Sequence, residues 1–439
     1  MASDKRPPAT RTRRMLKLAG MTASVASRYA ASKVRTALQR DPERKAETRS
    51  EHYEAMAETI TETLGQLKGA VMKVGQIASQ TQDFLPKEFA QALQRLQKEA
   101  PPMPWEVIAG QVTRELGAAP DDVFQRFDRE PWAAASIGQV HRARTHDGRE
   151  VIVKVQYPGV DDSVDADLRQ LKLTFRLSGL VKIPPESLDA LFEEIRERLS
   201  EELDYENEAR NLVRFRRFHE KDEGVIIPAV IRPLSSRRVL TLEYVEGDHI
   251  EHVKAPRYSQ AVINVIGHRL FRTMADQLFR FQAIHGDPHA GNFAFRPDGT
   301  LILYDFGCVK DLKPEIVARY RDALKAALRE DYGDLDRCLI DLGVRVKDQP
   351  AVGPDYYAVW RDVFIRPFDS RDTAYDYGAA DLHQQVAKNI PLLMKHIRHF
   401  QPPVETLFID RMIAGHYWML KRLGVQAAFR DELERYLAD

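Results

Sequence analysis

Cysteine is scarce in this chain, which has only Cys308 and Cys338 among its 439 residues. The two form no CxxC pair and no disulfide framework, so a reducing compartment is the expected setting. The sequence also lacks any apolar run of about 18 residues, the length that a membrane-spanning helix requires. We expect no secretory signal either, because the first residues are too polar.

The chain also has no formal net charge, since its 65 basic residues balance 65 acidic ones. This excludes a chain-wide field for nucleic acid, and we expect no nucleic-acid partner. The hydrophobic content of 44% is enough for a sizeable core. The length fits two or three domains, or one two-lobed domain with an extension.

The first 48 residues differ from the rest because they are basic and poor in acids. A helix over 15–38 would be basic and amphipathic, which suits an anionic membrane surface. Similar compositions occur in organelle transit peptides and in solvated tails, so three interpretations remain open.

The pattern of apolar residues then predicts helices, a small β-rich block and a larger helical block. This order predicts an α+β chain with a two-lobed protein-kinase-like fold. We expect a helical extension at 49–128, an N-lobe at 129–246 and a C-lobe at 247–439. The expected helices include 105–117, 161–177 and 188–218, and the expected strands are 137–143, 150–156, 225–230, 238–244, 292–295 and 301–304.

A catalytic pattern stands at the end of the strand predicted at 301–304, where Asp305 is followed by Phe306 and Gly307. An Asp at a strand end can coordinate a metal that bridges ATP phosphates. The tripeptide is weak evidence alone. Asp287 and Asn292 precede it at the spacing that kinases use to position the acceptor and to bind a second metal. We therefore predict Asp287 as catalytic, and Asn292 and Asp305 as metal ligands.

Lys154 lies in the apolar strand predicted at 150–156, and a buried ammonium needs a partner. A kinase supplies phosphates and a helix glutamate. The dense acidic run from Glu193 onward is mostly a solvated helix face, but one of its acids should pair with Lys154. We predict that this acid is Glu208.

The loop before this strand stands where a kinase carries its Gly-rich loop, and it is rich in alanine. Small side chains allow backbone to approach phosphates, although with less freedom than several glycines give. Residues predicted to bind the nucleotide are Ala133, Ala134, Ala135, Ser136, Lys154, Glu243 and Val245.

From about residue 51 to the C-terminus, this set resembles the UbiB family of atypical protein-kinase-like proteins, which supports ubiquinone biosynthesis. Lys73, Gly75 and Gln76 match the family's KxGQ motif. The alanine-rich loop 133–136 is a second match. Glu202 and Asp204 match its ExD motif, and in that register Glu208 falls on the glutamate that pairs with the strand lysine.

The resemblance implies that the extension folds over the active site, with Lys73 and Gln76 contacting Glu202 and Asp204 as a gate. It implies ATP and Mg²⁺ as cofactors, and ATPase or small-molecule kinase activity in quinone-lipid metabolism. The implied partners are an anionic membrane surface and quinone-lipid intermediates or their biosynthetic enzymes. The implied location is the cytoplasm, peripheral to the inner membrane, or the mitochondrial matrix in a eukaryote.

Two other functions stay open at this point. One is a conventional Ser/Thr protein kinase, which the alanine-rich loop and the extension argue against. The other is a pseudokinase scaffold that nucleotide switches, which the complete set of Asp287, Asn292 and Asp305 argues against. The sequence leaves open whether the chain is a monomer or a dimer.

Overall fold

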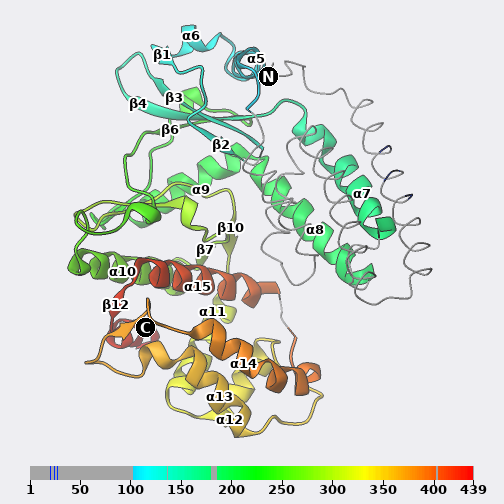
Figure 1. Cartoon of the computed structure of the whole chain (residues 1–439), viewed down its shortest axis with the longest axis vertical. Helices are drawn as coiled ribbons and strands as arrows, with labels where there is room; N and C mark the ends of the chain where they lie inside the picture. Colours follow the sequence, from blue (N-terminus) through cyan, green and yellow to red (C-terminus); the bar gives the residue numbers. More distant parts are fainter. Residues whose placement is uncertain are drawn as a thin grey trace, which may run out of the picture. The chain divides into compact units, whose positions relative to one another are not determined.

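The computed structural model describes residues 102–135, 137–178, 185–401 and 404–438, with Gly20, Ser24 and Ser27. Within it the chain divides into two compact units (Figure 1). Unit 1 contains the described residues up to Arg210 and the segment Val230–Tyr244, and unit 2 contains Asn211–Ala229 and the chain from Val245 onward. Residues 211–229, predicted above to belong to the N-lobe, cluster with unit 2. The helical pattern predicted for 49–101 lies outside the described residues.

Unit 1 is built on an antiparallel sheet with strand order β1, β3, β4, β6, in which β2 pairs with β3. Val151, Val153 and Val155 alternate along β4 and are buried, so one face of this strand points into the core. Lys154 lies on the other face. The strands are β1 (Arg126–Phe127), β2 (Ala133–Ala135), β3 (Gly138–Arg144), β4 (Glu150–Gln156) and β6 (Val239–Glu243).

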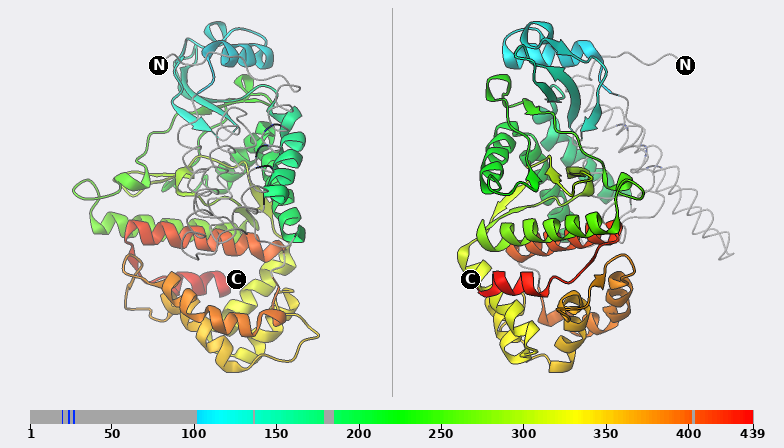
Figure 2. Two further views of the ribbon diagram at one scale, coloured as in Figure 1. Left: turned by 45° about the vertical axis from the view of Figure 1, so that its right-hand side comes forward. Right: turned by 90° about the vertical axis from the view of Figure 1, so that its left-hand side faces the viewer.

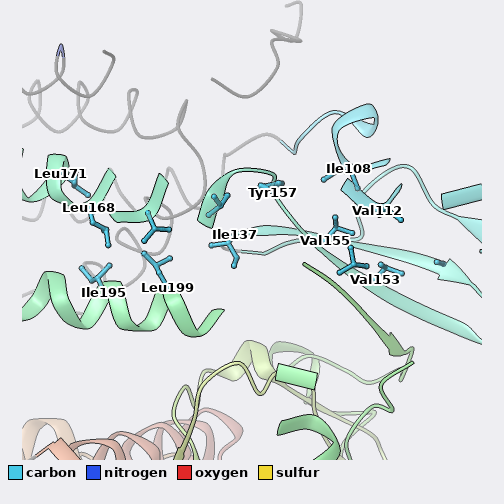
Figure 3. Close-up of a cluster of buried hydrophobic side chains, with 14 of the residues drawn as sticks. Ile108, Val112, Ile137, Val153, Val155, Tyr157, Leu168, Leu171, Ile195 and Leu199 are labelled. Carbon is cyan, nitrogen blue, oxygen red and sulfur yellow. The ribbon is translucent and has the colours of Figure 1, made fainter. Parts of the chain in front are cut away.

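Helices complete the core of unit 1. Helix α5 (Trp105–Leu116) buries Ile108 and Val112 in the same cluster as the β4 valines (Figure 3). It ends at Gly117, whose φ of 81° suits a left-handed C-cap, so the predicted end is confirmed. Helices α7 (Val160–Ser178) and α8 (Pro185–Glu202) pack through leucines and isoleucines on facing sides (Figure 3). A shorter helix, α6 (Pro120–Val123), follows α5.

The single helix predicted at 188–218 is wrong, because the structure divides it in two. Helix α8 ends at Glu202, and α9 (Tyr205–Phe218) begins three residues later. The break comes from Asp204, whose side chain accepts a hydrogen bond from Asn207 N at 2.9 Å. Such a bond satisfies an amide at a helix start, so Asp204 acts as the N-cap of α9.

Unit 2 is mostly helical. Helices α10 (Gln260–Ala275) and α15 (Val404–Leu423) lie side by side (Figures 1 and 2). In the described part of the chain, no helix is both long and apolar enough to cross a membrane. The other helices are α11 (Pro314–Leu328), α12 (Tyr332–Asp341), α13 (Pro354–Phe364), α14 (Leu382–Lys395) and α16 (Arg430–Ala438).

Short strands in unit 2 carry the loops that matter below. Strand β9 (Leu301–Leu303) pairs with β8 (Phe293–Phe295), as the predicted hairpin requires. It also pairs in parallel with β5 (Val225–Ile226), a pairing that was not predicted. Strands β7 (Ala283–His285) and β10 (Val309–Asp311) pair with each other and were not predicted, because three residues are too few for a periodic pattern. A last pair joins β11 (Tyr375–Asp376) to β12 (Gln426–Ala427). This mixture of helices and sheets confirms the predicted α+β class.

Candidate active site

Lys154 and Glu208 meet in unit 1, as predicted. The Lys154 Nζ atom lies 2.6 Å from Glu208 Oε1, and the two side chains are 12% and 4% exposed. The ammonium also lies over the Tyr205 ring, 5.4 Å from its centroid. Tyr205 and Glu208 are three residues apart on α9 and so share one face of the helix. A short, buried, charge-assisted contact of this kind holds the lysine in one orientation.

The start of α9 determines where Glu208 stands. Asp204 caps this helix with its side chain, and its backbone oxygen accepts from Glu208 N at 3.1 Å. The second carboxylate oxygen of Asp204 lies 3.6 Å from the Arg210 guanidinium. Asp204, predicted as part of the ExD motif, therefore has a structural role one turn before Glu208.

Gln156 connects this junction to the sheet, and sequence reasoning missed it. It is buried on β4, two residues after Lys154 and on the same face of the strand. Its Nε2 donates to Leu203 O at 3.0 Å and to Glu202 O at 3.4 Å. The end of α8, where the ExD motif lies, is thus fixed to the strand that carries the lysine. A buried glutamine two residues from a candidate lysine was the available signal.

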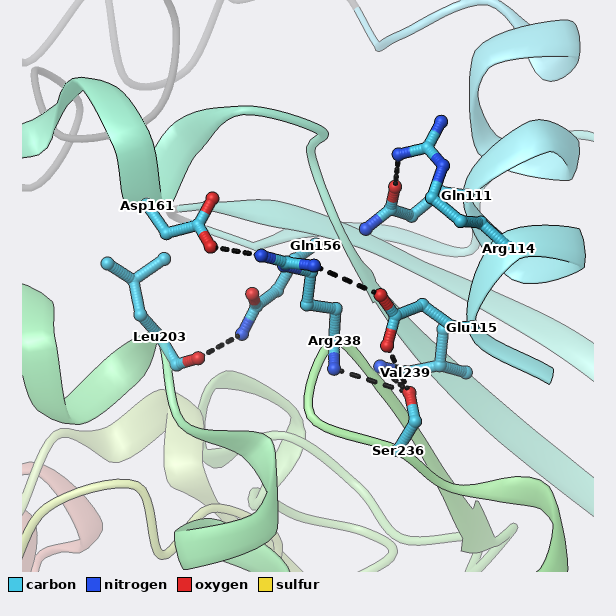
Figure 4. A network of polar contacts seen from close by, with 9 residues as sticks. All are labelled: Gln111, Arg114, Glu115, Gln156, Asp161, Leu203, Ser236, Arg238 and Val239. Carbon is cyan, nitrogen blue, oxygen red and sulfur yellow. Dashed lines mark hydrogen bonds and ion pairs between the residues drawn. The ribbon is translucent and has the colours of Figure 1, made fainter.

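A polar network joins other parts of unit 1 around Arg238 (Figure 4). The Arg238 guanidinium contacts Glu115 of α5 at 3.2 Å and also pairs with Asp161 at the start of α7. Ser236 Oγ donates to the second oxygen of Glu115 at 2.8 Å and accepts from Val239 N at 3.2 Å. These charge-assisted contacts tie α5 and α7 to the beginning of β6.

The alanine-rich loop forms strand β2, in which Ala133, Ala134 and Ala135 pair with β3. Ser136 lies outside the described residues. Gly138 follows, and a Cβ atom placed there would lie 2.3 Å from Val155 O. Glycine is therefore required where β3 approaches the lysine strand, a packing reason that sequence reasoning missed.

Glu243 and Val245 stand on either side of the boundary between the two units. Glu243 is the last residue of β6, opposite Val151. Val245 belongs to unit 2, and its backbone oxygen accepts a hydrogen bond from Tyr304 Oη at 2.8 Å. Their predicted role in nucleotide binding stays a prediction.

In unit 2, the predicted residues Asp287, Asn292 and Asp305 come together through the two strand pairs. Strand β7 leads into Asp287, and β9 leads into Asp305. Asn292 directly precedes β8, and its Nδ2 donates to Asp287 O at 2.9 Å. Its backbone oxygen accepts from Tyr304 N at 3.0 Å. The hairpin thus places the amide of Asn292 between the two loops that carry the aspartates.

His285 is the link between those two loops, and sequence reasoning gave it no role. It is 1% exposed at the end of β7. Its Nδ1 accepts from Asp287 N at 3.1 Å, and its Nε2 bonds to Asp305 O. Because a carbonyl only accepts, the Nε2 atom carries a proton. Gln277 Oε1 accepts from His285 N at 2.8 Å, which completes the support of this residue.

The oxygen atoms at this site suit a hard cation such as Mg²⁺. Asp305 offers a carboxylate, one oxygen of which accepts from Gly307 N at 2.9 Å, and Asn292 offers an amide oxygen. Mg²⁺ takes one or two such protein ligands together with phosphate oxygens. Across the described residues, no three or more His, Cys, Asp or Glu side chains form a metal-binding group by themselves. The donor set therefore fits a metal that shares its coordination with a phosphate.

Phe306, next to Asp305, is fully buried within unit 2. Its ring packs on Phe215 at a centroid distance of 4.6 Å and edge-on to His285 at 5.2 Å. Asn211 Nδ2 donates to Phe306 O at 3.0 Å. Residues from the second half of α9 thus fix the segment that follows Asp305, the predicted metal ligand.

Gly415 of α15 lies against the Asp287 loop. A Cβ atom at this position would lie 2.4 Å from Pro288 Cγ and 2.8 Å from Pro288 O. Because one of these atoms belongs to the backbone, any side chain would displace the loop that carries Asp287. Nothing in the local sequence of a helix signals such a contact.

His416, the next residue, is buried beside this loop. We expect it to make the stability of the protein depend on pH. Its Nδ1 donates to Met412 O at 2.8 Å, and its ring stands edge-on to Phe293. Burial lowers its pKa to about 4 and outweighs the hydrogen bond to Met412 O, which acts to raise it. The unfolded chain takes up this proton near pH 6.5, whereas the folded chain does so only near pH 4. Stability from neutral His416 is therefore complete above pH 6.5 and lost as pH falls toward 4.

We expect the free energy of unfolding to lose about 3 kcal/mol from this group between pH 6.5 and 4. His416→Phe should flatten that part of the profile, because no proton is then bound on unfolding. Urea unfolding at several pH values measures the difference between wild type and variant. The exposed His383 offers a matched control for the His→Phe change itself. Equal slopes for wild type and His416→Phe would contradict the assignment.

Only some of the residues predicted to form the gate are described by the structure. Glu202 and Asp204 stand at the junction of α8 and α9. Lys73, Gly75 and Gln76 lie outside the described residues, so their predicted contacts with Glu202 and Asp204 stay a prediction.

Comparison with known proteins shows the family of this chain. The model of the ABC1 atypical kinase-like domain matches residues 95–339, more than half of the chain. A protein of Dictyostelium discoideum named probable serine/threonine-protein kinase abkA is 32% identical over 390 residues, which cover 84% of this chain and 68% of the relative. The mitochondrial atypical kinase COQ8 of Saccharomyces cerevisiae is 30% identical over 370 residues, covering 83% of this chain and 73% of the relative.

A solved structure extends the likeness to three dimensions. It is a Mycobacterium tuberculosis protein in complex with erythromycin, 28% identical, with a TM-score of 0.60. The match covers 90% of this chain and 98% of that one. The resemblance inferred from the motifs is therefore confirmed. The chain belongs to the ABC1 atypical kinase-like family, in which the COQ8 proteins are relatives.

Proposed function

We propose that this protein binds Mg-ATP and transfers the γ-phosphoryl group to water or to a small-molecule or lipid acceptor, in support of quinone-lipid biosynthesis. The observation that carries the proposal is the set of three links around Asp287, Asn292 and Asp305, together with the Lys154–Glu208 ion pair. Kinases use these residue types for phosphate and metal binding. The link to quinone metabolism is supported by the family and by its COQ8 members.

Each residue would have a distinct role. Lys154 would hold the phosphates, in the orientation that Glu208 and Tyr205 give it. Asp305 and Asn292 would bind Mg²⁺, which when bound neutralises charge that develops on the phosphate oxygens. The backbone of 133–136 would approach the phosphates, and Glu243 and Val245 would contact the rest of the nucleotide.

Asp287 would act on the acceptor. As the acceptor oxygen forms its bond to the γ-phosphorus and the bond to ADP breaks, the acceptor proton passes to the Asp287 carboxylate. The Asp287 backbone is fixed at both ends for this purpose, by His285 on one side and by Asn292 on the other. Preorganisation of this kind lowers the barrier because little reorganisation remains during the reaction.

The predicted KxGQ gate could act on the phosphate-binding lysine through Asp204. If Lys73 contacts Asp204, it acts on the residue that caps the helix of Glu208. Such a contact would then bear on the position of Glu208 and, through it, of Lys154. The gate is therefore proposed to control phosphate binding as well as access.

A conventional Ser/Thr protein kinase is the second candidate, and the name of the Dictyostelium relative favours it. The alanine-rich strand β2 in place of a glycine-rich loop argues against it. A nucleotide-switched scaffold is the third candidate. It predicts binding of ATP without turnover.

One experiment separates the three. ATP hydrolysis is measured for wild type and Asp287→Asn, each with and without anionic liposomes and quinone-precursor phenols. We expect wild type to hydrolyse ATP, faster with liposomes or phenols, and the variant to lose at least about tenfold in rate. A parallel assay measures transfer from radiolabelled ATP to protein substrates. Rapid protein phosphorylation would favour the conventional kinase, and binding without any hydrolysis would favour the switch.

A further inference from the structure

Arg142 of β3 stands on the face of the unit 1 sheet that carries Lys154. Its neighbours along the strand, His141 and Ala143, are fully buried, so the Arg142 side chain points to the opposite face. Across the sheet Arg142 lies opposite Ile152, two residues before Lys154 on β4. Residues two apart on a strand share a face, so Arg142 and Lys154 belong to the same surface.

Two aromatic rings hold the guanidinium of Arg142. Its Cζ atom lies 4.3 Å from the ring centroid of Tyr244 and 5.0 Å from that of Trp132. The planes of the two rings are 83° apart, so a planar guanidinium can lie parallel to only one of them. Cation–π contacts of this kind orient the side chain without using its hydrogen-bond donors.

Those donors have no acceptor within the protein. Arg142 makes no hydrogen bond or ion pair with the described part of the chain, and its Nε atom is buried without a partner. Arg144, two residues later on the same strand, instead pairs with Glu150 and bonds to Gly148 O. A buried N–H group normally has an acceptor. The donors of Arg142 are therefore oriented toward an acceptor that the protein itself does not supply.

The order of residues along the sheet places Arg142 away from the phosphates of the proposed nucleotide. The groups that would approach the phosphates, which are strand β2 and Lys154, lie opposite residues 138–140 of β3. Arg142 lies two residues beyond that stretch. Its partner Tyr244 directly follows β6, between the two residues predicted to contact the rest of the nucleotide. A nucleotide whose phosphates are held by Lys154 would thus have its base near Arg142.

We propose that Arg142 is a specificity-determining residue, whose N–H groups donate to acceptor atoms on the edge of a purine base. Purines have a ring-nitrogen acceptor, N7, that pyrimidines lack, and arginine donates to it in protein–DNA contacts. Trp132 and Tyr244 are positioning residues, because they act through Arg142. The inference rests on the proposed function, and it concerns which nucleotide is bound rather than what happens to its phosphoryl group.

The test is equilibrium binding to the full chain with Mg²⁺, in which ATP, CTP and inorganic tripolyphosphate each compete with a fluorescent ATP analogue. We expect wild type to bind ATP at least about tenfold more tightly than CTP. Arg142→Met should weaken ATP binding by at least about tenfold, because hydrogen bonds from a charged donor are lost. Its affinity for tripolyphosphate should stay within about twofold of wild type.

A lysine at this position separates geometry from charge. Arg142→Lys keeps the positive charge but lacks the planar array of donors, so it should lose ATP affinity much as Arg142→Met does. Tyr244→Leu should weaken ATP binding in the wild-type background. It should have little further effect in the Arg142→Met background, because the residue that it positions is then absent.

Matched controls change side chains of the same kind elsewhere. Arg169→Met removes an exposed arginine of α7, and Trp418→Leu and Trp132→Leu replace tryptophans that are 51% and 58% exposed. The changes at Arg169 and Trp418 should leave all three affinities as in wild type. Trp132→Leu should weaken ATP binding alone, as Tyr244→Leu does. Melting temperatures check that each variant is folded.

The outcomes are distinct. Selective loss of ATP affinity in Arg142→Met and Arg142→Lys, with tripolyphosphate binding unchanged, supports the proposal. Equal losses for ATP and tripolyphosphate overturn it, because Arg142 then acts on the phosphates or on the fold. Wild-type ATP affinity in Arg142→Met, or equal affinity of wild type for ATP and CTP, also overturns it and leaves the proposed function standing. Failure of wild type to bind any of the three ligands overturns the proposed function and this inference with it.

Discussion

Asp305→Asn is expected to lower ATP turnover by at least about 100-fold. The physical reason is the loss of a full negative charge at the proposed metal site, where metal–phosphate charge stabilisation contributes several kcal/mol. The local fold should survive the change. The amide oxygen of asparagine can still accept from Gly307 N, and the link from His285 goes to the backbone oxygen of residue 305.

The measurement is Mg²⁺-dependent nucleotide binding and phosphate release, with the melting temperature as a check on folding. Asp311→Asn is the matched control, because Asp311 lies six residues later, is 69% exposed and pairs with Arg214. The control should retain wild-type turnover. If Asp305→Asn keeps both its Mg²⁺-dependent binding and its turnover, the metal assignment is wrong.

The second large effect concerns the stability of unit 1. Lys154→Met alone, or Glu208→Leu alone, should reduce the free energy of unfolding by about 3–5 kcal/mol, because each removes the opposite charge from a buried ion pair. The double variant Lys154→Met/Glu208→Leu should be much closer to wild type, since replacing both charges by apolar groups is often neutral. The coupling energy between the two changes should therefore be large.

Urea unfolding followed by circular dichroism measures this cycle. The pair Arg144–Glu150, 46% and 36% exposed on the same sheet, supplies the control, and its cycle should give less than about 1 kcal/mol. ATP turnover separates stability from function, because all three variants should be inactive, including the stable double variant. Additive losses in the double variant would refute an energetically coupled pair. Normal turnover in it would refute the proposed role of Lys154.

The chemistry of the candidate site was predictable from the sequence because it depends on residue types at short spacings. Asp287, Asn292 and Asp305 lie within about twenty residues. A hairpin turned at Gly299 brings Asn292 and Asp305 together, and the pairing of β7 with β10 brings Asp287 beside them. Lys154 was predictable as a site residue because a lysine in an apolar strand is expected to be buried, and a buried ammonium requires a partner. Its partner Glu208 was identified by the family register, because an acidic run on a helix contains several equivalent candidates.

The supporting residues were not predictable, since their roles depend on contacts between distant segments. Gly415 is required because α15 meets Pro288, which lies more than a hundred residues earlier. Nothing in the local sequence distinguishes Gln156 from other strand residues. Its role comes from the hydrogen bond to Leu203 O at the end of α8. His285 has a role because the fold places the Asp287 and Asp305 loops close enough for one imidazole ring to bond to both backbones.

The sequence by itself determined the α+β class, the family and the choice of residues proposed to bind phosphate and metal. These follow from composition, periodicity and local motifs, including the motifs that carry the family resemblance. All of them can be read without knowledge of the fold. Only the tertiary structure decided that α8 and α9 are separate helices, that Asp204 caps the second, and that Trp132 and Tyr244 flank the guanidinium of Arg142. Each of these depends on which side chains are removed from water when segments pack together. Such burial is a property of three-dimensional neighbours, and a one-dimensional pattern does not specify it.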